Sequence, residues 1–279
     1  MSRAYYNEID PFAAQWLRNL IAAGHIAPGD VDERSIEDVP PNELKGYTQC
    51  HFFAGIGVWS YALRRAGWPD DRPVWTGSCP CQPFSAAGEK KGFADERHLW
   101  PAWLHLISQC RPESVLGEQV ASGDGLTWLG TVQADMETEN YAFSAVDLCA
   151  AGVGAPHIRQ RLWFVAEWLA NTSRDGLQGG LHWGPDQKWQ VEHGSAGCLR
   201  PTGWLVGAES SGQTNGIWRD ADWLLCKDGK WRPVESGTFP LVNGTPSRMG
   251  RLRAYGNAIN AELATLFIAS YMDIKRGEA

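Results

Sequence analysis

The feature that most constrains the fold is an alternation of short apolar runs with longer helical patterns, which continues to about residue 170. Runs that end in glycine or a turn and alternate with helical stretches are typical of βα units around a mostly parallel sheet. The pattern predicts strands at residues 49–53, 73–76, 114–116 and 162–166. It predicts helices at residues 11–23, 58–66, 99–110, 126–137 and 258–272. We therefore expect an α/β fold with helices on both faces of the sheet.

The texture of the sequence changes between residues 171 and 244, where glycine and tryptophan are frequent and helical periodicity is lost. We expect a separate small lobe there, irregular or β-rich, while residues 1–170 and 245–279 form the main domain. A chain of 279 residues is long enough for one substantial core and such an insertion.

Composition excludes several classes of protein. No run approaches the roughly 18 apolar residues of a membrane span, and the N-terminal residues lack the apolar region of a secretory signal, so we expect a cytoplasmic protein. Seven cysteines without paired metal spacing favour reduced thiols, and neither a disulfide framework nor a metal site is expected. The net charge of −7 argues against nonspecific coating of nucleic acid, but it permits a basic cleft. Three groups of basic residues are candidates for such a cleft: Lys90, Lys91 and Arg97; Arg159 and Arg161; Arg248, Arg251 and Arg253.

The most informative segment is GSCPCQPFS, residues 77–85, which follows an expected strand. Cys81 has prolines close on either side, so a rigid backbone holds its thiol, and such a thiol is a nucleophile where nearby positive charge favours the thiolate. The segment resembles the proline-cysteine motif of the cytosine-C5 DNA methyltransferases. A cysteine taken alone would more often be a small buried apolar residue.

Further blocks resemble the same family in register. GEQV, residues 117–120, is similar to its Glu-Asn-Val block, with Gln119 in place of asparagine. APHIRQRLWFVA, residues 155–166, is similar to its Gln-x-Arg-x-Arg block, with His157 in place of glutamine. GNAINAEL, residues 256–263, resembles its C-terminal Gly-Asn block, and FAGIG, residues 53–57, resembles its glycine loop. The resemblance implies a Rossmann-like class I methyltransferase fold, and it covers the chain outside the lobe.

The order of the blocks departs from the family's pattern. The family places its ribose and adenine blocks between the glycine loop and the proline-cysteine motif, but only residues 58–78 intervene here. Residues 7–17, NEIDPFAAQWL, resemble the ribose block and residues 28–32, PGDVD, resemble the adenine block. This transposition predicts one crossing from an edge strand back to the centre of the sheet, carried by residues 33–47. The alternative is an unrelated N-terminal helix and a lost cofactor pocket.

The resemblance implies a role for each matching residue. Cys81 would add to carbon 6 of a flipped cytosine, Glu118 would act at N3, and Arg161 at O2, with Arg159 nearer phosphate or structure. The expected DNA contacts are Gln82, Ser85 and Arg97, the last two on phosphate. The residues expected to bind S-adenosylmethionine are Glu8 at the ribose, Asp30 at the adenine amine, Ile9 and Phe53 at the adenine faces, Asn257 at the methionine carboxylate, and Val31, Ala54, Gly55, Ile56, Gly57, Pro80 and Ala258.

The lobe occupies the place of the family's target-recognition region. Its tryptophans would stack on bases or, for most of them, pack a small core; they are Trp183, Trp189, Trp204, Trp218, Trp223 and Trp231. The expected activity is therefore that of a monomeric DNA (cytosine-5)-methyltransferase acting on duplex DNA. Two alternatives stay open: a transfer-RNA methyltransferase of the same family and a catalytically silent DNA-binding relative. The sequence does not choose among a restriction system, a phage and a regulatory circuit.

Overall fold

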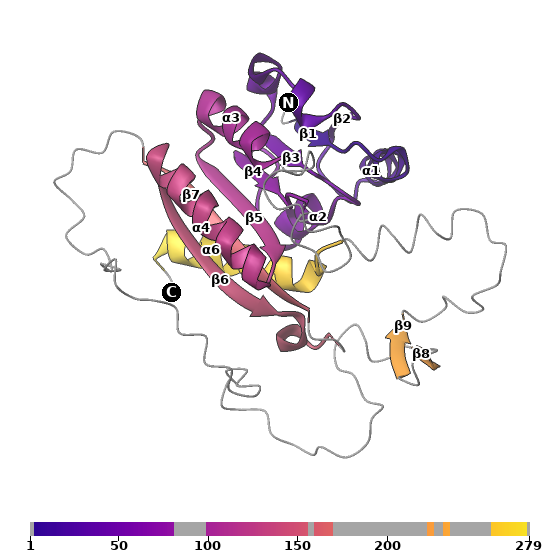
Figure 1. Ribbon diagram of the computed structural model, residues 1–279. Coiled ribbons are helices and arrows are strands. Elements are labelled where there is room, and N and C mark those ends of the chain that lie inside the picture. Colours follow the sequence, from indigo (N-terminus) through magenta and orange to yellow (C-terminus); the bar gives the residue numbers. More distant parts are fainter. Residues whose placement is uncertain are drawn as a thin grey trace, which may run out of the picture. The chain divides into compact units, whose positions relative to one another are not determined.

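A computed structural model describes residues 3–80, 99–155, 159–169, 222–225, 231–234 and 258–277. Seven strands form one sheet in the order β2-β1-β3-β4-β5-β7-β6 (Figure 1). Neighbouring strands from β2 to β5 pair in parallel, and β7 is antiparallel to both β5 and β6. Their bounds are β1 Ala4–Asn7, β2 Gly29–Asp32, β3 Gln49–Phe52, β4 Val74–Gly77, β5 Ser114–Val120, β6 Tyr141–Cys149 and β7 Gln160–Trp168.

Helices cover both faces of this sheet, and Figure 1 shows α4 and α6 on opposite sides of it. One face packs against α1 (Pro11–Ala22), α2 (Val58–Arg65) and α6 (Ala261–Arg276). The other packs against α3 (Trp100–Cys110), α4 (Gly123–Thr138) and the 3-10 helices η1 (Ile36–Asp38) and η2 (Pro41–Gly46). A further 3-10 helix, η5 (Ala150–Val153), follows β6. The sequence predicted each of the five α-helices among the described residues to within a few residues, and the α/β fold of Rossmann-like type is confirmed.

Local sequence explains where these helices begin. Asp10 accepts hydrogen bonds from the backbone N–H groups of Phe12 and Ala13, and Pro11 occupies the first turn of α1. Asn260 caps α6 in the same way through the N–H of Leu263. Gly277 ends that helix in the left-handed conformation, with φ 71°.

Aromatic rings fill the core on the α3 and α4 face, and two strand glycines make room for them. Trp103 lies over Gly77, where an added Cβ would stand 2.5 Å from the ring. Phe164 lies over Gly117, where the corresponding distance is 2.1 Å. The two glycines are register partners on β4 and β5. A side chain at either position would displace a buried ring immediately before the strand ends that carry the candidate site.

The transposed order of the strands is present in the sheet. β2, the second strand in the chain, lies at the edge, whereas β3 lies between β1 and β4. Residues 33–47 make the crossing from edge to centre, as the sequence predicted. They contain two 3-10 helices, and Ile36, Val39 and Leu44 anchor them in the core.

Three strands of the sheet were not predicted. β1 (AYYN) is buried throughout, but its run of Ala4, Tyr5 and Tyr6 was overlooked, and β2 (GDVD) has a single apolar residue. β6 lies at the opposite edge, and four consecutive residues near its middle are exposed, so its sequence shows no buried face. Of the expected lobe, the structure describes only a pair of antiparallel strands, β8 (Asp222–Leu225) and β9 (Trp231–Val234). None of the described helices combines the length and the apolar character that crossing a membrane requires.

Candidate active site

The glycine loop lies where β3 ends, between the carboxyl ends of β1 and β4. Three of its residues have positive φ: Phe53 at 51°, Gly55 at 55° and Gly57 at 82°. Gly57 precedes α2, and a Cβ there would come within 3.0 Å of the Leu17 side chain, so the turn needs glycine on two counts. A Cβ at Gly55 would meet no atom within 4 Å among the described residues, so the loop borders open space at that point. Ligands bind in α/β sheets at such carboxyl ends.

Glu8 follows β1 directly and contacts this loop. Its Oε2 accepts a hydrogen bond from the backbone N–H of Gly55 at 2.7 Å, and its Oε1 accepts one from Asp10 N at 2.9 Å. Burial raises the pKa of the Glu8 carboxyl group, although both backbone donors oppose that shift. The next residue, Ile9, is 65% exposed. The structure thus brings Glu8 and the glycine loop together, as the transposed motifs require.

These residues fit the adenosine part of S-adenosylmethionine by their chemistry. A carboxylate at this strand end can accept hydrogen bonds from two ribose hydroxyls, and it lies against a loop with open space in front of Gly55. Ile9 and the half-buried Phe53 offer apolar surface for a flat base. In the described part of the chain, no group of three or more His, Cys, Asp or Glu side chains is placed to hold a metal ion.

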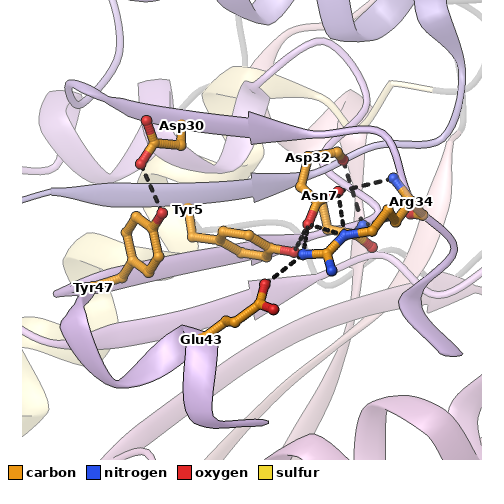
Figure 2. Close-up of polar contacts among 7 residues, drawn as sticks. All are labelled: Tyr5, Asn7, Asp30, Asp32, Arg34, Glu43 and Tyr47. Carbon is orange, nitrogen blue, oxygen red and sulfur yellow. Dashed lines mark hydrogen bonds and ion pairs between the residues drawn. The ribbon is translucent and has the colours of Figure 1, made fainter. Parts of the chain in front are cut away.

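Asp30 is not brought together with Glu8. It lies two residues before the end of β2, where its carboxylate pairs with Arg3 Nη2 at 2.5 Å and accepts from the Tyr47 hydroxyl at 2.7 Å (Figure 2). Asp32, at the end of the strand, is the acidic residue of β2 that contacts Glu8, since its backbone carbonyl accepts a hydrogen bond from Glu8 N at 3.0 Å. The assignment of Asp30 to the adenine amine stays a prediction. Asp32 was missed, although the alternation of PGDVD placed it on the same face of the strand.

A polar network around Asp32 joins the crossover segment, residues 33–47, to β1 and β2 by hydrogen bonds. Asp32 accepts from Tyr5 at 2.7 Å and pairs with Arg34, which also reaches Glu43 at 2.6 Å (Figure 2). Asn7 donates to the carbonyl oxygen of Arg34 at 2.9 Å. Burial alone would raise the pKa of Asp32, but the hydrogen bonds from Arg34 and Tyr5 hold it below its usual range. The network borders a cavity of about 260 Å³ at the edge of β2.

A buried ion pair connects the end of β5 to the beginning of β7. The Arg161 Nε lies 2.7 Å from Glu118 Oε1, and the Glu118 side chain is 8% exposed. In the antiparallel register Glu118 faces Trp163 and Val120 faces Arg161, so the paired side chains are diagonal neighbours on one face. Burial raises the pKa of Glu118, while Arg161, Arg159 and the Ser78 hydroxyl oppose the shift. The structure therefore joins two of the predicted catalytic residues.

Arg159 connects this pair to the C-terminal segment. Its Nη2 donates to the backbone carbonyl of Ala258 at 2.7 Å. Burial lowers the pKa of Arg159, as does the neighbouring Arg161, while Glu118 raises it. The sequence left Arg159 between phosphate contact and structure, and this bond gives it a structural contact. Gln119, where the family has asparagine, donates to the carbonyl of Cys79 at 3.5 Å.

The remaining predictions divide by position. Pro80 directly precedes Cys81, and the Ala258 carbonyl accepts a hydrogen bond from Arg159, so both lie next to the site. Val31 lies on β2 beside the Asp32 network. Cys81, Gln82, Ser85, Arg97, His157, Asn257 and the tryptophans' side chains of the lobe lie outside the described residues. Ser78 and Trp59 were missed, although Ser78 stands in the recognised motif.

Comparison with known proteins shows which family the stretch around this site resembles. Residues 69–168 match a family model described as C-5 cytosine-specific DNA methylase. The resemblance to the cytosine-C5 DNA methyltransferases is confirmed. The matched stretch runs from the residues before β4 to the end of β7, so it contains Cys81, Glu118, Arg159 and Arg161.

Several methyltransferases are similar in sequence to part of this chain. The Type II methyltransferase M.AplI of Arthrospira platensis is 34% identical over 95 residues, which cover 33% of this chain and 28% of that protein. M.HhaI of Haemophilus parahaemolyticus is 32% identical over 99 residues, covering 34% of this chain and 30% of that protein. The chain thus spans about a third of the length of these relatives. A solved structure of a Spodoptera frugiperda DNMT2 variant covers 60% of this chain and 43% of that chain, at 17% identity and a TM-score of 0.41.

Proposed function

We propose that this chain is a DNA (cytosine-5)-methyltransferase that attacks a flipped cytosine through Cys81 and takes its methyl group from S-adenosylmethionine. The observation that carries the proposal is the buried Glu118–Arg161 pair at 2.7 Å, beside the end of β4 where the proline-cysteine segment begins. All of these residues fall inside the stretch that matches the family model, whose description names DNA. DNA is therefore the proposed partner.

The cofactor would lie over the carboxyl ends of β1, β2 and β3. Glu8 would accept hydrogen bonds from the ribose hydroxyls. The loop N–H of Gly55 already holds its carboxylate at the strand end where the ribose would lie. Ile9 and Phe53 would hold the adenine, and Asp32 would lie at its polar edge. Asp30 and Val31 lie earlier on β2, and Asp30 would bind the adenine amine by giving up its contacts with Arg3 and Tyr47. Asn257 would reach the methionine carboxylate. When bound, S-adenosylmethionine supplies an electrophilic methyl group.

The chain's own residues make carbon 5 reactive. The Cys81 thiolate would form a bond to carbon 6, and the electron pair of the 5,6 double bond would move toward N3 and O2. Glu118 would give a proton or hydrogen bond to N3, and Arg161 would donate to O2, so the developing charge meets groups already in place. After methylation, loss of the carbon-5 proton expels the cysteine. The base must leave the duplex for this geometry.

A covalent trap tests the proposal directly. Fluorine at carbon 5 cannot leave as a proton, so duplex DNA with 5-fluorocytosine and S-adenosylmethionine should leave Cys81 joined to the base. We expect a denaturant-resistant complex with the wild-type protein and none with Cys81→Ser. Cys79→Ser is the matched control, because this buried thiol lies two residues away and should not form the adduct.

The outcomes separate the competing activities. A complex with 5-fluorocytosine transfer RNA, and none with a mixed-sequence DNA pool, would replace the proposed substrate by RNA. No complex with either nucleic acid, in a folded protein that binds S-adenosylmethionine by calorimetry, would indicate a silent relative and contradict the proposed chemistry.

A further inference from the structure

Ser78 lies between the proposed catalytic carboxylate and a buried indole. It is the first residue after β4, and its Oγ accepts a hydrogen bond from Trp59 Nε1 at 3.1 Å. Trp59 belongs to α2 and is 3% exposed. An indole nitrogen can only donate a hydrogen bond, so the Ser78 hydroxyl oxygen acts as the acceptor toward Trp59. Its single hydrogen is thereby directed to the other side.

On that other side is Glu118. Ser78 and Glu118 directly follow Gly77 and Gly117, the last register partners of β4 and β5, so their side chains are neighbours. The Ser78 hydroxyl opposes the rise in the pKa of the Glu118 carboxyl group, as a hydrogen-bond donor does, and that carboxyl group also receives Arg161 Nε at 2.7 Å. The charged side chains that face Glu118 among the described residues are Arg161 and Arg159, at the beginning of β7. Three elements thus meet at one carboxyl group: the end of β4 through Ser78, the start of β7 through its arginines, and β5, which carries Glu118.

We propose that Ser78, oriented by Trp59, is a positioning residue that fixes the Glu118 carboxyl group toward the N3 edge of the target cytosine. The inference rests on the proposed function, because it gives Ser78 its role in that reaction. Arg161 alone would leave the carboxyl group free to rotate about its last bond. A second donor on a different strand end removes that freedom and does so without adding charge.

The proposal has a consequence for proton affinity. A donor hydrogen bond stabilises the carboxylate over the acid, so loss of the Ser78 hydroxyl should raise the pKa of Glu118 beyond its already raised value. If Glu118 must carry a proton to serve N3, methylation falls as pH rises through this pKa. The alkaline limb of the rate profile should therefore move to higher pH in Ser78→Ala, while the maximal rate falls about tenfold through lost orientation.

The test compares Ser78→Ala, Ser78→Thr and Trp59→Phe with the wild-type protein. Carbon-13 NMR of labelled carboxyl groups, with Glu118→Gln to assign the signal, follows the titration of Glu118 without any reaction. We expect an upward displacement in Ser78→Ala, a smaller one in Trp59→Phe, and recovery in Ser78→Thr, which keeps the hydroxyl. The pH profile of 5-methylcytosine formation should move in the same order, with the KM for DNA little changed.

Each result decides a different statement. A Glu118 titration that coincides in the wild-type, Ser78→Ala and Trp59→Phe proteins would overturn the positioning role, even if methylation is measured. If Ser78→Ala does not fold, Trp59→Phe gives the same comparison through the indole. If the titration moves as expected but no variant, including the wild type, methylates cytosine, the link between Ser78 and Glu118 stands, but the proposed function and the role of Ser78 in it both fail.

Discussion

Glu8 is the residue on which the proposed cofactor pocket most depends. Its carboxylate contacts the glycine loop, and a neutral Glu8→Gln side chain would replace one acceptor oxygen by an amide donor. We expect the Kd for S-adenosylmethionine to rise at least tenfold, because a hydrogen bond to a charged group contributes about 1.5–3 kcal/mol. Titration calorimetry measures this change, with the exposed Glu37→Gln as control. Equal affinity in both variants would remove Glu8 from the ribose site.

Asp32 makes the stability of the fold depend on pH. Its pKa is lowered in the folded protein, so its contribution is complete above the unfolded value of about 3.9 and is lost as pH falls through the folded value. Asp32→Asn should lower the free energy of unfolding by about 1–2 kcal/mol near neutral pH. In urea titrations the difference from wild type should narrow below about pH 4.5. The exposed Asp38→Asn should show no such narrowing.

At the scale of single elements, the paired strand glycines set how closely the aromatic layer approaches the sheet. Gly117→Ala would place a methyl group inside the ring of Phe164, and overpacking of this kind costs about 1–3 kcal/mol. We expect a lower unfolding midpoint in urea and a similar slope. The double variant with Phe164→Leu should lose less than the sum of the two single variants, because the smaller side chain makes room. Full additivity would mean that the contact is not the cause.

The sequence predicted helices and strands well where apolar residues recur at regular spacing, and poorly where no such spacing is present. The five α-helices carry apolar positions at helical spacing, and several begin at a capping residue such as Asp10 or Asn260. β1 and β2 are no shorter than the predicted strands β3 and β4, but β2 has a single apolar residue, and both strands could be inferred only through the motifs that overlap them. In the site, the resemblance to the family's motifs predicted Glu8, Glu118 and Arg161. The side-chain directions of Asp30 and Ser78 depend on tertiary contacts with Tyr47 and Trp59 that no local pattern contains.

At the scale of the whole molecule, the transposition leaves short gaps at the amino ends of the strands. Thr48 N donates to Arg3 O at 2.9 Å, and Val74 N donates to Thr48 O at 3.3 Å. Residues 48–72 could therefore be placed ahead of residues 3–47, which would then be followed by residues 73–279. The two new junctions, from residue 72 to residue 3 and from residue 47 to residue 73, lie beside these hydrogen bonds and need only short linkers. We expect this reordered chain to fold and to bind S-adenosylmethionine as the original does. Loss of the helical circular-dichroism spectrum would show that the present connections are required.

The position of β2 at the edge also governs the order in which the sheet can assemble during translation. β1 and β2 are parallel neighbours joined through α1, so this unit contains its own strand pairing. It emerges from the ribosome ahead of β3, the central strand on which it finally docks. The strands proposed to receive the nucleoside thus emerge before the strands proposed to carry the catalytic residues, which then add to the sheet on the side of β3.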